Sequence, residues 1–236
     1  MHLTESTQQL TDGDSQFTIT VIEAEQPAGV VVFAAGRGGS PLRHLGLLRA
    51  MARQGYTVIA PHFDLLPVVV PTMHNLDTRI RRLHLALQQY APPGKPIMGI
   101  GHSLGCVVLL VLAGAKARTH LGDEVASARQ WHFAGLVLLA PAVDFFMYPE
   151  ASLDVQARIY LRTGNHDTMV APNRVADLAG RLPHPPAVEL HIDEDAGHFS
   201  YMDELPPQVN DCQPCRHTFL SILAEDVGQF MESLVL

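Results

Sequence analysis

The 236-residue chain contains only 3 cysteines, which are too few to form a disulfide scaffold. No apolar run approaches the roughly 18 residues that a membrane-spanning helix needs. The polar stretch 1–6 lacks the apolar core of a signal peptide. The net charge of −8 disfavours a nucleic acid or an anionic membrane surface as a partner. We therefore expect a cytoplasmic protein that binds neither nucleic acid nor membrane.

The composition predicts a single domain over residues 1–236. Hydrophobic residues make up 47% of the chain and charged residues 17%, which is enough to build one core, and no linker or repeat divides the chain. Apolar runs of strand length alternate with helical periodicity, so we expect an α/β fold with a mostly parallel central sheet flanked by helices. The expected strands are 30–35, 56–60, 96–100, 136–140, 158–164 and 188–192, with an antiparallel strand at 17–22.

Helical stripes fill the intervals between these strands. They consist of apolar side chains spaced three or four residues apart, as expected for helices that bury one face. The stripes are Ile80, Leu83, Leu87 and Tyr90; Val175, Leu178 and Leu182; and Leu220, Leu223, Val227, Phe230 and Leu234. Too few residues separate Asp144 from Arg158 for a lid domain, so we expect an open cleft, with any control of access coming from the loops 64–76 and 201–215.

The most informative motif is Gly101-His102-Ser103-Leu104-Gly105, which lies between a strand-like run and a continuous apolar helix. At such a sharp strand-to-helix turn the central serine is strained and exposed, and this geometry is typical of an activated nucleophile. Small residues are needed two positions away on either side, which Gly101 and Gly105 provide. The backbone N–H of Leu104 stands at a helix N-terminus and predicts one half of an oxyanion hole.

A serine hydroxyl needs a general base and an acid that orients it, which follow later in the chain in the order acid, then histidine. Asp167 comes just after the strand 158–164, and His198 comes after the strand 188–192. His102 and His166 are the nearest rivals for the base, but His102 should point away from the serine oxygen and His166 precedes the acid.

Other carboxylates compete with Asp167 for the role of the acid. Asp144 is the serious rival because it also follows a strand-like run, at 136–140. Asp193 and Asp195 share the loop of the histidine and are interpreted as solvated turn residues. Chain order favours Asp167.

The second oxyanion donor is expected in the glycine-rich loop 36–41 after the strand 30–35. We assign it to the N–H of Arg37, with Gly38 close enough to replace it.

The order Ser103, Asp167, His198 resembles the α/β-hydrolase superfamily, over roughly residues 17–234. Ala196-Gly197-His198-Phe199-Ser200-Tyr201 is loosely similar to the branch of dienelactone-hydrolase-like and platelet-activating-factor-acetylhydrolase-like proteins. Two positions differ. Dienelactone hydrolases look to have a cysteine where this chain has Ser103, and the common His-Gly before the oxyanion residue is Ala35-Gly36 here.

The resemblance implies a serine hydrolase that cleaves a small carboxylic ester through an acyl-enzyme intermediate, without a cofactor or a metal ion. The same three residues would also serve a thioesterase or a lactone hydrolase, and a ligand-binding protein on a hydrolase fold with vestigial activity is a further alternative. Cys212 and Cys215, with His217 nearby, leave a metal site, a redox-sensitive pair or two unlinked thiols open. Cys106 is expected to pack beneath the turn.

Overall fold

The computed structural model of the chain describes residues 3–67, 70–182 and 188–235. An eight-stranded sheet forms its centre, in the order β1-β2-β4-β3-β5-β8-β9-β10. The strands are β1 (Leu3–Asp12), β2 (Ser15–Ala24), β3 (Gly29–Ala34), β4 (Tyr56–Pro61), β5 (Ile97–His102), β8 (Gly135–Leu139), β9 (Arg158–Gly164) and β10 (Val188–Asp193). Two short strands, β6 (Ala117–Arg118) and β7 (Glu124–Val125), form a separate pair.

The central strands pair in parallel, from β4 through β3, β5, β8 and β9 to β10. Every residue of β3, β4 and β8 is buried, as expected for parallel strands that are covered on both faces. Because parallel strands share one direction, their carboxyl ends lie along one edge of the sheet. The loops after β3, β5, β9 and β10 therefore open on the same side of the molecule.

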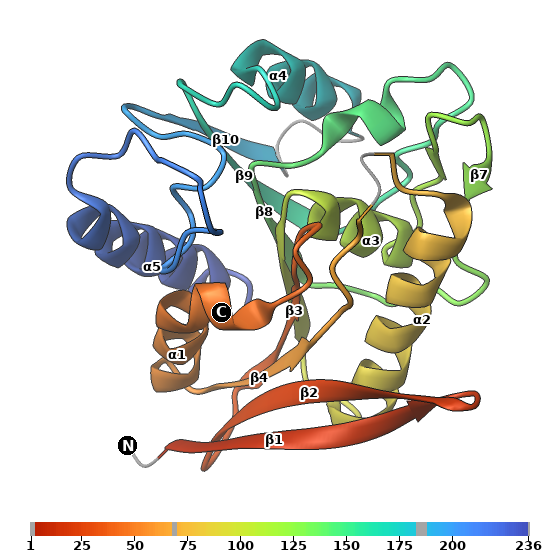
Figure 1. Ribbon diagram of the computed structural model, residues 1–236. Helices are drawn as coiled ribbons and strands as arrows, with labels where there is room; N and C mark the ends of the chain where they lie inside the picture. Colours follow the sequence, from red (N-terminus) through yellow and green to blue (C-terminus); the bar gives the residue numbers. More distant parts are fainter. Residues whose placement is uncertain (1–2, 68–69, 183–187, 236) are drawn as a thin grey trace.

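The first two strands form a long antiparallel hairpin, and β2 joins the sheet by pairing antiparallel to β4. Figure 1 shows this hairpin crossing one end of the molecule. The strand expected at 17–22 lies within β2, whereas β1 is not predicted from the sequence. The resemblance from residue 17 onward therefore omits a strand that begins at Leu3.

Helices cover the sheet on two sides, with α1 and α5 together on one side and α2 and α3 together on the other (Figure 1). The α-helices are α1 (Leu45–Arg53), α2 (Met73–Tyr90), α3 (Leu104–Leu112), α4 (Pro172–Arg181) and α5 (Arg216–Glu232); the 3-10 helices are η1 (Pro41–His44) and η2 (Val143–Phe146). All nine residues of α3 are buried. The predicted stripes on α2, α4 and α5 pack into the core, and the expected sheet flanked by helices is confirmed.

Among the residues that the structure describes, no separate lid covers the carboxyl edge of the sheet. Residues 147–157, which join η2 to β9, contain no helix and make one isolated bridge, from Ser152 to Lys116. The expectation of a fold without a lid domain is confirmed. Over the described parts of the chain, none of the helices combines the length and apolar character needed to cross a membrane.

Candidate active site

The chain turns sharply at Ser103, between the last residue of β5 and the first residue of α3. Ser103 has φ 54° and ψ −119°, a conformation that side chains rarely adopt. The residues two positions away on either side must be glycine, because a Cβ on Gly105 would overlap the carbonyl of Ala34 and one on Gly101 would lie 2.9 Å from the nitrogen of Cys106. This agrees with the strained serine turn predicted from the motif. Leu104 begins α3, so its N–H has no partner within the helix.

A chain of two hydrogen bonds links three predicted residues from distant parts of the sequence. The Nε2 atom of His198 lies 2.9 Å from Oγ of Ser103, and its Nδ1 atom lies 2.8 Å from Oδ2 of Asp167. The Asp167 side chain is fully buried and that of His198 is 4% exposed. Since the other oxygen of Asp167 accepts the N–H groups of Met169 and Val170, each at 2.8 Å, the carboxylate is held in one orientation.

The loops that carry Asp167 and His198 are fastened to each other and to the sheet. The N–H of His166 donates to the carbonyl of Ala196 at 2.9 Å, and a Cβ on Gly164 would overlap that same carbonyl. Oγ of Ser200 accepts the N–H of Gly197 at 2.7 Å and donates to Asp211 at 2.7 Å. The backbone hydrogen bond from His166 to Ala196 joins the two loops, and it holds the carboxylate and the imidazole at hydrogen-bonding distance.

The rival residues Asp144, His166 and Asp195 are not part of this chain of hydrogen bonds. Asp144, on η2, forms an ion pair with Arg174 of α4, and His166 is exposed. Asp195 lies in an exposed turn with φ 54°, as predicted.

The interpretation of Asp193 as a solvated turn residue was wrong. Its side chain is buried, paired with Arg162, and accepts a hydrogen bond from the hydroxyl of Tyr201 at 2.7 Å. Asp193 ends β10 and pairs across to β9, so its carboxylate faces an arginine inside the sheet. It therefore braces the base of the His198 loop.

The glycine-rich loop after β3 lies against Ser103. A Cβ on Gly36 would be 3.1 Å from Cβ of Ser103, so only glycine allows the loop to pass this close. Arg37 follows immediately, and its side chain is exposed and turned to the carbonyls of Leu66 and Pro67, at 2.9 and 3.3 Å. Its side chain therefore lies apart from the backbone N–H groups of Arg37 and Gly38, which stay the candidate oxyanion donors predicted from the sequence.

Two buried histidines stand in a row with His198. The rings of His102 and His198 have centroids 5.2 Å apart, and those of His44 and His102 are 5.1 Å apart. Nε2 of His102 donates to the carbonyl of His198 at 2.9 Å, and Nδ1 of His44 donates to the carbonyl of Tyr201 at 3.0 Å, because a carbonyl can only accept. Burial lowers the pKa of both imidazoles, that of His44 to about 4. Both rings are therefore neutral at pH 7 and do not repel a positive charge on His198.

Sequence reasoning missed His44 and Arg79 as parts of this region, and it considered His102 only as a rival for the base. Nε2 of His102 bonds to the carbonyl of His198, so this side chain supports the main chain of His198. Arg79 is a buried cation on α2. It stands three residues after Leu76 and four before Leu83, so an arginine on the apolar face of the helix was the available signal.

The cysteines take no part in the hydrogen-bond chain. Cys106 is buried beneath the turn, as predicted, and burial raises the pKa of its thiol. Cys212 and Cys215 are exposed and unlinked. Within the described ranges, no group of three or more histidine, cysteine or acidic side chains is arranged to hold a metal ion.

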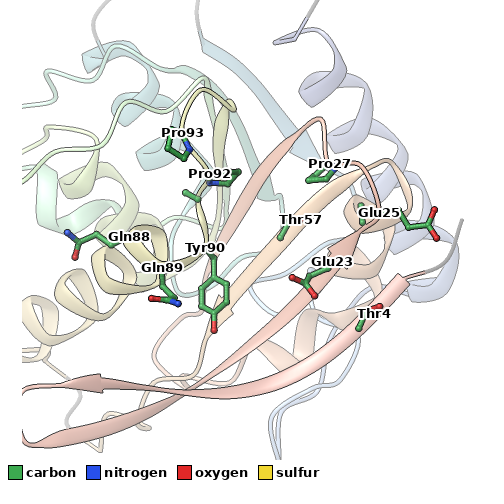
Figure 2. Close-up of a pocket in the computed structure, with 12 residues that line it drawn as sticks. Thr4, Glu23, Glu25, Pro27, Thr57, Gln88, Gln89, Tyr90, Pro92 and Pro93 are labelled. Atoms are coloured by element: carbon green, nitrogen blue, oxygen red, sulfur yellow. The ribbon is translucent and has the colours of Figure 1, made fainter.

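A hollow of about 620 Å³ lies away from these residues, between the end of α2 and the hairpin (Figure 2). Its labelled polar side chains include Glu23, Glu25 and Tyr90, and neither Ser103 nor His198 lines it. This hollow therefore lies outside the hydrogen-bonded group at the carboxyl edge of the sheet.

Comparison with known proteins shows similarity in structure. The chain is similar to a dienelactone hydrolase from Anabaena variabilis, at 16% identity and a TM-score of 0.69 over 98% of each chain. It is also similar to an esterase from Pyrococcus furiosus, at 17% identity and a TM-score of 0.67 over 99% of this chain and 94% of the other. A serine hydrolase without lid from Xanthomonas campestris gives 17% identity and a TM-score of 0.61 over 83% of this chain and 86% of the other.

No protein-family model and no curated protein sequence matches the chain. The structural neighbours establish the α/β-hydrolase fold predicted from the sequence, with a mostly parallel sheet and no lid domain. At this level of identity the similarity concerns the fold, and the chemistry must be argued from the site itself.

Proposed function

We propose that this protein is a serine-dependent carboxylic ester hydrolase. The observation that carries the proposal is the chain of hydrogen bonds from Ser103 through His198 to Asp167, at 2.9 and 2.8 Å. A hydrolase or esterase activity also agrees with the esterases and hydrolases among the structural neighbours. A serine held by an imidazole that is itself held by a buried carboxylate is equipped for acyl transfer.

In the proposed reaction, Oγ of Ser103 attacks the ester carbonyl carbon while Nε2 of His198 takes the hydroxyl proton. The N–H groups of Leu104 and Arg37 donate to the oxyanion, Asp167 holds the imidazolium, and His198 then gives its proton to the leaving alcohol. Water attacks the acyl-serine with His198 again as the base, which releases the acid and restores the serine. No cofactor enters either step.

The surroundings of the site favour small esters with apolar groups. The segments after β3, β4 and β9 carry three exposed apolar side chains, Leu42 on η1, Leu65 and Met169, which are 45%, 66% and 61% exposed. Because no lid domain covers this edge, an ester can approach without a closing step. Thioesters and lactones would use the same groups.

The test compares the native protein with Ser103→Ala, using a fluorophosphonate probe and 4-nitrophenyl esters of increasing acyl length. We expect the native protein to be labelled and to turn over, with the variant unlabelled and slower by at least about a thousandfold. Turnover that survives in Ser103→Ala would contradict the serine mechanism. A native protein that neither labels nor turns over would favour the ligand-binding alternative.

A further inference from the structure

The guanidinium of Arg79 holds the loop that contains both candidate oxyanion donors. Its Nη1 atom lies 3.2 Å from the carbonyl oxygen of Ala35 and 2.7 Å from that of Gly36. Its Nη2 atom lies 3.1 Å from the carbonyl of Arg37 and 3.0 Å from that of Asp64. One side chain from α2 thus binds three consecutive carbonyls of the loop and one from the loop after β4.

These carbonyls determine where the N–H groups of the loop point. A peptide unit is planar and trans, so fixing its oxygen directs its N–H to the opposite side. The carbonyl of Gly36 shares a peptide unit with the N–H of Arg37, and the carbonyl of Arg37 shares one with the N–H of Gly38. By holding both oxygens, Arg79 turns both N–H groups away from α2. Gly36 itself packs on Ser103, so the loop that carries these N–H groups passes beside the serine.

The burial of this cation requires an explanation. Arg79 is only 2% exposed, and its guanidinium makes no ion pair within the described residues; it instead stacks over the ring of Phe63 at 4.9 Å. Burial lowers its pKa to about 10, which still leaves it charged at pH 7. Burying a charge without a carboxylate is costly, and apolar packing alone would not need an arginine here. The four hydrogen bonds to carbonyl oxygens are the interactions that offset the cost of burying this charge.

We propose that Arg79 is a positioning residue for the oxyanion hole, an inference that rests on the proposed esterase function. Its fork of N–H donors presets the peptide units of Gly36 and Arg37, so that no reorientation is needed when negative charge develops on the substrate oxygen. Hydrogen bonds to the carbonyl also polarise the peptide and strengthen its N–H as a donor. Arg79 acts on the transition state through the backbone and touches no substrate.

The test uses Arg79→Lys and Arg79→Gln, with Arg82→Lys as the matched control. Arg82 lies one turn further along the same helix and is also buried, but it contacts Asp12 and Asp64, each at 3.4 Å, and none of the three oxyanion-loop carbonyls. For each variant, kcat and KM for 4-nitrophenyl acetate are measured per fluorophosphonate-reactive site. The same preparations are titrated with a trifluoromethyl ketone, which forms a tetrahedral oxyanion, and unfolded in urea.

We expect kcat of Arg79→Lys to fall by about 10- to 100-fold, with KM within about threefold of the native value. Affinity for the trifluoromethyl ketone should fall in parallel, and Arg79→Gln should lose more. Arg82→Lys should lose stability but keep its kcat. Counting reactive sites corrects for molecules that fail to fold.

The inference is overturned if Arg79→Lys and Arg82→Lys lower kcat equally, or if affinity for the ketone is unchanged in both Arg79 variants. A rise in KM without a fall in kcat would also overturn the inference. These outcomes differ from failure of the proposed function, in which the native protein itself neither labels nor turns over.

Discussion

At the residue scale, the two candidates for the acid of the site, Asp167 and Asp144, can be compared by substitution. Asp167 is buried with both oxygens occupied, whereas Asp144 is partly exposed and paired with Arg174. Asp167→Asn keeps the size of the side chain but removes the charge that stabilises the imidazolium. We expect kcat to fall by about a thousandfold or more, measured with 4-nitrophenyl acetate on folded protein.

Asp144→Asn is the control for this change. It removes only a partly exposed ion pair, so activity should remain within about twofold and stability should change little. If Asp144→Asn abolished activity while Asp167→Asn did not, the assignment of the acid would be wrong.

The buried imidazole of His44 should make the free energy of unfolding depend on pH. Burial lowers its pKa in the folded state to about 4 from an ordinary 6.5, so the unfolded chain binds a proton more readily. The contribution of a neutral His44 is therefore complete above about pH 6.5 and is lost as the pH falls toward 4. Between about pH 7 and about pH 5 the free energy of unfolding should fall by about 2 kcal/mol through this residue alone.

Urea unfolding at both pH values measures this effect, and His44→Asn provides the comparison. An asparagine amide can still donate to the carbonyl of Tyr201 but does not titrate. The variant should lose less stability on acidification by the amount assigned to His44. Equal pH dependence in both proteins would show that His44 is not held neutral in the fold.

At the element scale, the crossing of β3 and α3 sets how closely the oxyanion loop approaches the serine. Gly105 lies in the first turn of α3, where a Cβ would overlap the carbonyl of Ala34 in β3. Gly105→Ala should therefore force the two elements apart and lower the free energy of unfolding by roughly 2–4 kcal/mol. Chemical denaturation measures the loss, and any folded protein that remains should be less active.

Gly180→Ala is the matched substitution on α4, where nothing lies within 4 Å of the added Cβ. There the higher helix propensity of alanine should raise stability, by up to about 1 kcal/mol. If both substitutions had the same effect, close packing at the turn would not explain the need for Gly105.

The elements that could be predicted are those with buried faces. Runs such as 136–140 and the stripe on α5 are recognisable because burial requires apolar residues at fixed spacing. In contrast, β1 is mostly exposed and polar, and its ten residues pair with β2 through the backbone. Its one local signal is the turn at Gly13, whose φ of 61° suits a tight hairpin. The hydrogen-bonded residues Ser103, Asp167 and His198 could be predicted from their order in the sequence and their positions in loops, because parallel strands bring their carboxyl ends together.

Contacts that depend on three-dimensional packing could not be predicted in the same way. Nothing in the order of residues places the side chain of Arg79 on three carbonyls of the loop 35–37, because this contact depends on how α2 packs beside β3. The same holds for Asp193, whose burial depends on Arg162 of the neighbouring strand. Periodicity locates a face, but the partner of a polar group on that face is set by the tertiary fold.

At the scale of the whole molecule, the parts of the site come from four strand ends on one edge of a single sheet. Arg37 follows β3, Ser103 follows β5, Asp167 follows β9 and His198 follows β10. Since none of these residues is near another in sequence, the geometry of the site depends on the order of the strands. The buried side chains beneath the site include His44 and His102. Their low pKa values change the number of protons that the folded protein binds.

Four histidines, His44, His62, His84 and His102, have a pKa lowered mainly by burial. Near the sequence isoelectric point of about 5.9, the folded protein therefore carries fewer protons than the unfolded chain. Burial raises the pKa of Asp203, which opposes the shift by one group at most. The folded protein should therefore have the lower isoelectric point.

Isoelectric focusing with and without urea measures this difference, and His44→Asn separates it from any general effect of urea. In the folded state His44 carries almost no charge near pH 6, so its replacement should leave the native isoelectric point unchanged. In the unfolded state the same replacement removes a titrating group and should lower the isoelectric point. If the substitution instead shifted the native isoelectric point, the imidazole of His44 would be charged in the folded protein. The description of His44 and His102 as neutral rings beside His198 would then be wrong.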